Sequence, residues 1–275
     1  MMTRPIPSTG EPMPVIGLGT WRAFDVGADE VARRPLREVL QRLFDAGGRI
    51  IDTSPMYGRA EAVTGDLLAA TGARPRSFLA TKVWTTGRER GIAQMRRSAH
   101  LLRSEVIDLI QIHNLVDWRT HLATLRRMKE EGRVRYIGIT HYMTGALPEL
   151  ARILRGEPGI DFVQLGYSLA TRTAETKLLL TAAERGVAVI VNQPMERGDL
   201  FHRVRRHALP DWAREFDCAS WVELFLKYIL AEPAVTCIIP ATGNPEHMAD
   251  NLAAGCGRLP DARQRQRIRE FWDAA

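Results

Sequence analysis

The chain has 275 residues, enough for one α/β barrel of about 250 residues, and we expect residues 1–275 to form a single domain. Charged residues make up 25% and hydrophobic residues 45% of the sequence, a balance that excludes extensive disorder and is typical of soluble globular proteins. The net charge is +6, but no basic run alternates with aromatic residues, so the composition argues against a nucleic-acid partner.

Cys218, Cys237 and Cys256 stand far apart and form no CxxC motif. This pattern predicts neither a disulfide framework nor a zinc site, and it fits a reducing compartment. The first fourteen residues lack the apolar core of a signal peptide, and no window reaches the roughly 18 apolar residues of a membrane span. We therefore expect a cytoplasmic protein with no metal and no membrane contact.

Apolar runs alternate with amphipathic segments along the whole chain. Residues 1–14 place prolines on both sides of a turn sequence, which predicts a hairpin that plugs one end of the fold. Strands are predicted at residues 15–21, 50–52, 78–83, 106–113, 135–140, 162–167, 187–192 and 236–240. Helices are predicted at residues 29–46, 60–70, 89–103, 118–131, 146–154, 174–185, 211–231, 245–254 and 261–272. Eight strand-and-helix units in series favour a closed (β/α)8 TIM barrel with an N-terminal β-hairpin plug over an open sheet.

Four side chains that can ionise or form hydrogen bonds lie at the ends of three consecutive predicted strands. Asp52 ends one strand, and Tyr57 follows in the loop beyond it. Lys82 ends the next strand and His113 the third, at intervals of 30 and 31 residues, each of which fits one strand and one returning helix. Because a barrel of this type carries its chemistry at the carboxyl ends of the strands, we expect the four side chains to meet at one mouth.

The four side chains suit the protonation of a carbonyl oxygen. A tyrosine such as Tyr57 has an unperturbed pKa of about 10 and is a poor acid at neutral pH unless a cation stabilises its phenolate. Lys82 is the candidate cation, with Asp52 holding its ammonium group, while neutral His113 would orient the substrate oxygen. None of these groups can deliver hydride, so a nicotinamide cofactor is implied. The alternatives are a purely structural Lys82–Asp52 salt bridge and a hydrogen-bonded core histidine.

Seven stretches of the chain, taken in order, resemble the aldo-keto reductase family: VIGLGTW, RIIDTSPMYG, FLATKVW, DLIQIHN, EGRVRYIGIT, FVQLGYS and IIPATGNPEHMADNLAA. They cover nearly the whole chain. The resemblance implies an (α/β)8 barrel and an ordered, NAD(P)H-dependent reduction of an aldehyde or ketone to an alcohol. The catalytic tetrad that it implies is Asp52, Tyr57 as general acid, Lys82 and His113. The cofactor contacts that it implies are Gly19, Thr20, Trp21, Asp52, Thr140, His141, Gln164, Asn192, Pro194, Met195, Arg197, Ala241, Thr242, His247, Asp250 and Asn251.

Three places depart from the usual pattern of that family. Thr140 and His141 stand where many members carry Ser-Asn, and Asn192 stands where many stack an aromatic ring on the nicotinamide. Ala241 and His247 stand where members that prefer NADPH often offer a lysine and an arginine to the 2'-phosphate. From the habit of the family we expect NADPH as the cofactor, with NADH as the alternative.

Five apolar side chains follow predicted strand ends and are candidates for the wall of a pocket for aromatic or medium-chain aldehydes: Trp21, Phe24, Met56, Trp84 and Trp118. Each of them also fits a role in loop packing. The chain ends about where its last helix does, so we expect no long covering tail and an open pocket.

Two other functions compete with a carbonyl reductase. One is a nucleotide-sensing regulatory subunit that keeps the barrel and the cofactor site but has little turnover. The other is a metal-dependent barrel enzyme, which would need clustered carboxylates or histidines at the strand ends; Asp52 and His113 alone do not form such a cluster. We expect the partner to be a small-molecule carbonyl compound and the protein to be a monomer.

Overall fold

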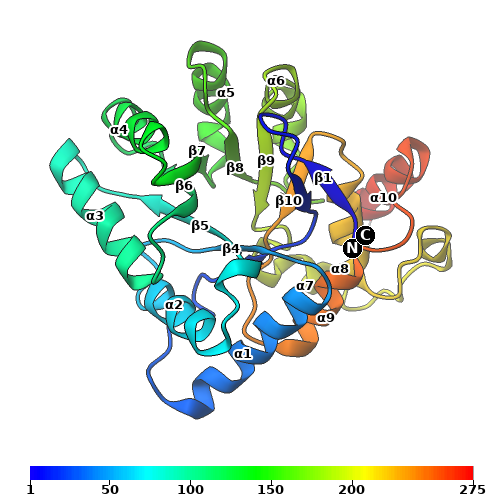
Figure 1. Ribbon diagram of the computed structural model, residues 1–275. Coiled ribbons are helices and arrows are strands. Elements are labelled where there is room, and N and C mark those ends of the chain that lie inside the picture. The colour runs from blue at the N-terminus through cyan, green and yellow to red at the C-terminus, as the bar shows by residue number, and fades with distance from the viewer. Residues whose placement is uncertain (275) are drawn as a thin grey trace.

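The computed structural model describes residues 1–274 and shows a ring of parallel strands with helices around its outside (Figure 1). The strands of the ring are β3 (Leu18–Gly19), β4 (Ile50–Asp52), β5 (Phe78–Val83), β6 (Ile107–His113), β7 (Val134–His141), β8 (Phe162–Gly166), β9 (Ala188–Asn192) and β10 (Val235–Ile238). Each pairs in parallel with the next, and bridges from Ile16 to Ile238 and from Gly19 to Ala241 join the two edges. The predicted (β/α)8 barrel is confirmed; Ala275 lies outside the described residues.

The helices follow the predicted alternation. They are α1 (Glu30–Asp45), α2 (Ala60–Thr71), α3 (Arg88–Leu101), α4 (Trp118–Glu130), α5 (Leu147–Gly156), α6 (Leu178–Glu184), α7 (Asp199–Val204), α8 (Trp221–Leu230), α9 (Pro245–Ala253) and α10 (Ala262–Ala274). In α1 the buried residues Leu36, Val39, Leu40 and Leu43 recur at helical spacing, so one face of the helix packs on the barrel. Asp29 caps its first turn by accepting from the N–H groups of the helix.

The prediction of one long helix at residues 211–231 is wrong. The structure has a 3-10 segment, η5 (Asp211–Phe216), and then α8, with a break between them. Asp217 has a φ of 57°, which ends the first segment, and extended Ser220 starts the second by accepting from the N–H of Glu223. The predicted helix 174–185 is likewise divided, into η3 (Thr173–Thr176) and α6, and the loop predicted after Pro194 contains α7.

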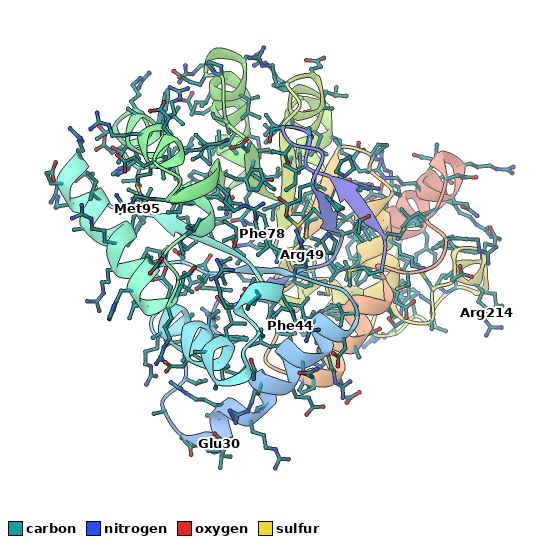
Figure 2. All side chains as sticks on the ribbon, viewed as in Figure 1. Glu30, Phe44, Arg49, Phe78, Met95 and Arg214 are labelled. Carbon is teal, nitrogen blue, oxygen red and sulfur yellow. The ribbon has the colours of Figure 1, made fainter. Side chains whose placement is uncertain are left out.

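The predicted hairpin closes the amino-terminal end of the barrel. Its strands, β1 (Thr3–Pro5) and β2 (Pro12–Pro14), pair antiparallel. Its residues Ile6 and Met13 are fully buried against the barrel interior, where three aromatic rings, Phe78, Tyr136 and Phe162, pack with centroids 5.5–6.1 Å apart. Phe78 lies near the middle of the ring, whereas Glu30 and Arg214 lie at the periphery (Figure 2). This end of the interior is therefore filled and apolar.

Alternation along the strands changes the interior from apolar to polar toward the other end. On β5 the side chains of Phe78 and Ala80 belong to the interior cluster, and two residues later Lys82 continues the same face. β6 and β8 show the same change, because two residues after apolar Leu109 comes Gln111, and two residues after Phe162 comes Gln164. A buried polar layer thus lies beneath the carboxyl ends of the strands.

Residues 1–274 lack two features that would point to other functions, a membrane-spanning helix and a metal-binding cluster. No helix there is both long and apolar enough to cross a membrane. No group of three or more His, Cys, Asp or Glu side chains within those residues is arranged to hold a metal ion. Cys218 and Cys237 are buried and Cys256 is exposed, and all three are free thiols.

Candidate active site

Asp52 and Lys82 form a buried ion pair at the ends of β4 and β5. Lys82 Nζ donates to Asp52 Oδ2 at 2.6 Å and to the carbonyl oxygen of Thr53 at 2.7 Å. Only 1% of the lysine side chain and 4% of the aspartate side chain is exposed. Burial alone would lower the pKa of Lys82, but the charges of Asp52 and Tyr57 outweigh it and raise that pKa. Lys82 is therefore a cation at neutral pH.

Two glutamines satisfy the other oxygen of Asp52. Gln111 and Gln164 each donate an amide N–H to Asp52 Oδ1, at 3.2 and 3.0 Å. The carboxylate therefore accepts three hydrogen bonds in the barrel interior and is fixed in orientation. Gln111 is not among the residues predicted from the sequence. Its position two residues before His113 on β6 puts both side chains on the inner face, and this period-two spacing is the pattern that would have identified it.

The side-chain oxygen of Gln164 also has hydrogen-bond partners, and they link β8 to β7 and β9. Gln164 Oε1 accepts from Thr140 Oγ1 at 3.1 Å and lies 3.4 Å from Asn192 Nδ2. Asn192 Oδ1 and Gln111 Oε1 are buried and have no hydrogen-bond partner. A nicotinamide carries an amide that can donate to such an acceptor, so these residues fit that group.

Tyr57 lies above Lys82. The lysine Nζ is 5.2 Å from the centroid of the tyrosine ring. Burial raises the pKa of Tyr57 more than the charge of Lys82 lowers it, and Asp52 raises it further. The net direction is the reverse of the expected one, because the ring is withdrawn from water and Asp52 offsets the lysine charge. Tyr57 thus keeps its proton at neutral pH, as a proton donor must.

His113 completes the group at the end of β6. Its ring meets the Tyr57 ring edge-on, with centroids 6.2 Å apart, and its Nδ1 lies 3.1 Å from Ser54 Oγ. Burial, followed by the charge of Lys82 and then His141, lowers the pKa of His113 to about 3. His113 is therefore neutral at neutral pH. The structure brings all four predicted side chains, Asp52, Tyr57, Lys82 and His113, to one mouth.

The loops after β3 and β9, two strands apart in the ring, meet at the carboxyl end of the barrel. Thr20 is buried and donates its hydroxyl to the carbonyl of Asp52 at 3.0 Å. Two guanidinium groups contact the ring of Trp21, that of Arg22 at 4.4 Å and that of Arg197 at 4.8 Å from the ring centroid. Arg197 belongs to η4 (Glu196–Gly198), which follows β9, so its contact with Trp21 connects the first strand loop to the seventh.

The other predicted cofactor residues lie around the same ring of strand ends. Gly19 is bridged to Ala241, and Pro194 is buried while Met195 packs partly against the main core. His141 is half-buried after Thr140 at the end of β7.

The segment after β10 contains the remaining four predicted residues. Thr242 is buried and accepts from the N–H of Asn244, whereas His247 is exposed on α9. Asp250 Oδ1 accepts from Ser220 Oγ at 2.6 Å, so this carboxylate is tied to the start of α8. Asn251 is buried on the same helix.

Four of the five predicted wall residues divide into two groups, and the fifth, Trp21, is half-buried beside Arg22 and Arg197. Met56 and Trp84 are 42% and 43% exposed at the mouth, and the Trp84 ring centroid is 6.5 Å from that of His113. Phe24 is fully buried in the main core, and Trp118 is 9% exposed beneath the guanidinium of Arg119, so neither offers an open surface to a substrate. Phe24 turns inward because its N–H bonds back to the carbonyl of Thr20.

Tyr142 and Met143 are exposed near the mouth but are not among the pocket residues predicted from the sequence. They follow the last residue of β7 and are 41% and 55% exposed, and the Tyr142 ring stacks on His141 with centroids 5.8 Å apart. An exposed apolar pair directly after a strand end is the pattern that would have identified them. Together with Met56 and Trp84 they make the rim of the mouth partly apolar.

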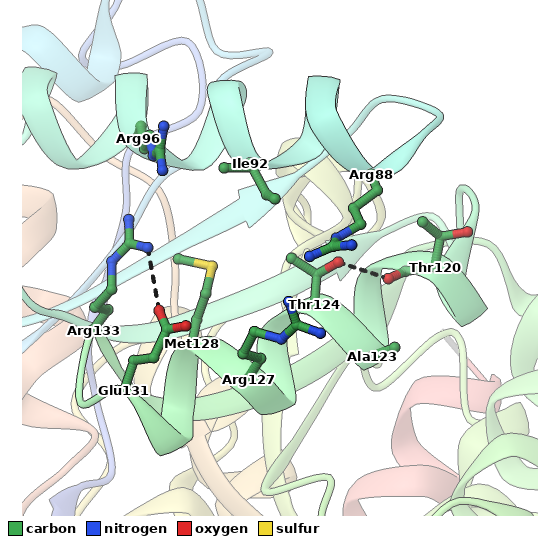
Figure 3. Close-up of a pocket in the computed structure, with 10 residues that line it drawn as sticks. All are labelled: Arg88, Ile92, Arg96, Thr120, Ala123, Thr124, Arg127, Met128, Glu131 and Arg133. Atoms are coloured by element: carbon green, nitrogen blue, oxygen red, sulfur yellow. Dashed lines mark hydrogen bonds and ion pairs between the residues drawn. The ribbon is translucent and has the colours of Figure 1, made fainter.

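A separate cavity lies on the outer wall of the barrel, between α3 and α4 (Figure 3). Its volume is about 380 Å³. Its lining includes Arg88, Arg96 and Arg127, and the side chain of Arg133 is paired with Glu131 at 3.4 Å. No residue at the strand ends takes part, so this cavity is distinct from the mouth.

Comparisons with known proteins agree with the geometry. The model of the Aldo/keto reductase family matches residues 15–273. A 9,11-endoperoxide prostaglandin H2 reductase of Trypanosoma cruzi is 28% identical over 92% of this chain and 86% of its own, and a methylglyoxal reductase of Escherichia coli is 25% identical over 88% and 85%. An aldo-keto reductase of Klebsiella pneumoniae in complex with NADPH has a similar fold, with a TM-score of 0.83, 23% identity and coverage of 99% and 96%.

Proposed function

This chain belongs to the aldo-keto reductase family, and we propose that it reduces an aldehyde or ketone to an alcohol with Tyr57 as the proton donor. The observation that carries the proposal is the buried Lys82–Asp52 pair beneath a protonated Tyr57, with neutral His113 beside it. The purely structural interpretation of the ion pair does not account for the tyrosine and histidine at the same mouth.

A bound nicotinamide cofactor supplies hydride to the carbonyl carbon. The protein acts on the carbonyl oxygen, which gains negative charge as the reaction proceeds. Tyr57 gives its proton to that oxygen, and the cation of Lys82 stabilises the phenolate that remains. Asp52, held by two glutamines, keeps the lysine charged and in place. His113 stays neutral and offers a ring nitrogen to the substrate oxygen.

NADPH is the cofactor that we propose, with NADH as the alternative. The amide of Gln164, the hydroxyl of Thr140 and the unpartnered oxygen of Asn192 would hold the nicotinamide end. Exposed His247 in the first turn of α9 and the guanidinium of Arg197 would hold phosphate, in the first case with help from helix N–H groups. Family habit and the NADPH complex of the Klebsiella pneumoniae structure support this choice.

We also propose that the protein is a monomeric, cytoplasmic, single-domain enzyme over residues 1–275 that does not bind nucleic acid. Its reduced thiols and the lack of basic runs with interleaved aromatics support this. A regulatory nucleotide sensor finds no support, because a sensor has no need for a buried set of groups that handles a proton.

The first experiment measures the loss of nicotinamide absorbance with 4-nitrobenzaldehyde, using NADPH and then NADH, for the natural protein and for Tyr57→Phe. The variant keeps the ring and loses the proton, so kcat should fall by about 10²- to 10⁴-fold while nucleotide affinity and Tm stay unchanged. The matched control is Tyr136→Phe at the closed end of the barrel, whose hydroxyl contacts Thr9 and Glu11; its kcat should match that of the natural protein. Equal turnover by Tyr57→Phe would refute the assignment of the proton donor. Binding of both nucleotides without turnover of any aldehyde would favour the sensor.

A further inference from the structure

One four-residue turn after β4 carries both Tyr57 and the partner of His113. The N–H of Tyr57 donates to the carbonyl of Ser54 at 3.0 Å, and Pro55 occupies the second position, which suits the fixed φ of proline. The Ser54 side chain is fully buried and its Oγ lies 3.1 Å from Nδ1 of His113. The turn that presents the proton donor therefore also holds the histidine.

The hydrogen bonds of Ser54 determine which nitrogen of His113 carries the proton. A hydroxyl has one proton to donate and two lone pairs that accept. Ser54 Oγ accepts a hydrogen bond from the N–H of Met56 at 3.4 Å. Among residues 1–274, the acceptor within reach of the hydroxyl proton of Ser54 is Nδ1 of His113. If Nδ1 were protonated, the hydroxyl proton would be buried without a partner, which is unfavourable.

We propose that Ser54 is a positioning residue that holds His113 in the tautomer with its proton on Nε2. The inference rests on the proposed carbonyl reduction, because this tautomer gives the mouth a neutral N–H donor for the substrate oxygen. Nε2 has no hydrogen bond to the protein and is not among the buried atoms without a partner, so it faces the accessible side of the ring. The opposite tautomer would present a lone pair to the oxygen and repel it.

The tautomer can be read without any turnover. The protein is labelled with ¹⁵N-histidine, and a long-range ¹H–¹⁵N correlation spectrum is recorded at pH 7; comparison with His113→Gln identifies the signals of His113 among the seven histidines. In the natural protein Nδ1 should be unprotonated and Nε2 protonated. In Ser54→Ala the pattern should shift toward a mixture of tautomers. An unchanged tautomer in Ser54→Ala would overturn the proposal.

Kinetics then test whether the tautomer serves the reaction. In Ser54→Ala, kcat should fall about tenfold with little change in KM, since the lost interaction is made in the transition state. In the His113→Gln background, Ser54→Ala should cause no further loss, because Ser54 acts only through His113. An equal loss in both backgrounds would show a merely structural role, and a shifted tautomer with unchanged kcat would refute the role in catalysis.

Two further variants guard against trivial outcomes. Ser98→Ala makes the same chemical change at a fully buried serine of α3 outside the mouth, and it should leave the tautomer and kcat unchanged. Ser54→Cys keeps most of the volume with a weaker donor, so its kcat should lie between those of the natural protein and Ser54→Ala, and it replaces the alanine variant if that one fails to fold. If the natural protein reduces no aldehyde while Ser54 still sets the tautomer, the proposed function fails and the assignment of the tautomer stands.

Discussion

Each end of the barrel brings together a carboxylate, a cation and a tyrosine, but the ion pair is buried at one end and partly exposed at the other. At the mouth, Asp52 and Lys82 lie beneath Tyr57, and their side chains are 4% and 1% exposed. At the closed end, Glu11 is 20% exposed and pairs with the 42% exposed Arg135, and it accepts from the hydroxyl of Tyr136 at 2.7 Å.

Depth in the barrel accounts for the difference between the two ends. At the closed end, hydrogen bonds from Tyr136 and Arg49 outweigh the effect of burial and lower the pKa of Glu11, while water still reaches the pair. This set of charges holds the hairpin in place. Burial raises the pKa of the tyrosine at both ends, Tyr57 and Tyr136, so both keep their protons at neutral pH. The two ends differ in the ion pair beside the tyrosine, which is closed to water at the mouth and open to it at the closed end.

The largest expected effect is that of Lys82→Met. Removal of the cation leaves Asp52 charged and unpaired in the interior, so the free energy of unfolding should fall by about 3–5 kcal/mol, and turnover should be lost. Urea unfolding and the aldehyde assay measure the two effects. Arg135→Met is the matched change at the closed end and should cost less than Lys82→Met, with normal kcat, because its pair with Glu11 is open to water and its second partner, Asp108, keeps its contact with Arg74. Similar losses for both variants would mean that depth does not distinguish the two ends.

The second effect separates the ends by pH. His113 binds a proton near pH 6.5 in the unfolded chain and only near pH 3 in the folded protein, so acid favours the unfolded state throughout that window. The contribution of neutral His113 to the free energy of unfolding is complete above pH 6.5, and about 2 kcal/mol of this contribution should be lost by pH 5. Urea unfolding at pH 7 and pH 5 should show this loss in the natural protein and not in His113→Gln. The pKa of Glu11 is lowered, so the closed end should lose stability only below its unfolded value of 4.5.

The smallest expected effect is that of Glu11→Gln. The amide keeps the shape but loses the charge-assisted hydrogen bonds to Arg49 and Arg135, and the free energy of unfolding at pH 7 should fall by about 1 kcal/mol. Denaturant titration measures the change, and kcat should be unaltered. A loss of turnover in this variant would show that the two ends are coupled through the aromatic interior.

The sequence predicted the barrel and the convergence of its four mouth residues because strand period and even spacing are local properties of the chain. Other features depended on tertiary contacts. The break between η5 and α8 arises at Asp217 and Ser220, where capping ends an otherwise helix-compatible run. Gln111 was within reach of the two-residue alternation, whereas the contact of Ser54 with His113 joins positions 59 residues apart and has no sequence pattern. Burial of Phe24 depended on how one loop folds back.

The junction where β3 meets β10 and closes the barrel limits how this sequence can diverge. Backbone N–H groups of Gly17 and Gly19 donate to the carbonyls of Ile238 and Pro240 across it. A Cβ at Gly17 would lie 1.8 Å from a methyl carbon of Ile50, and one at Gly19 would lie 2.9 Å from the carbonyl oxygen of Ile239. A larger residue at Gly17 would press on Ile50 of β4, and one at Gly19 would press on the backbone just after β10, so either change would displace the chain that leads into Thr20 and Trp21. Mutational drift at these two glycines is therefore restricted by the circumference of the ring, even though neither residue carries a reactive group.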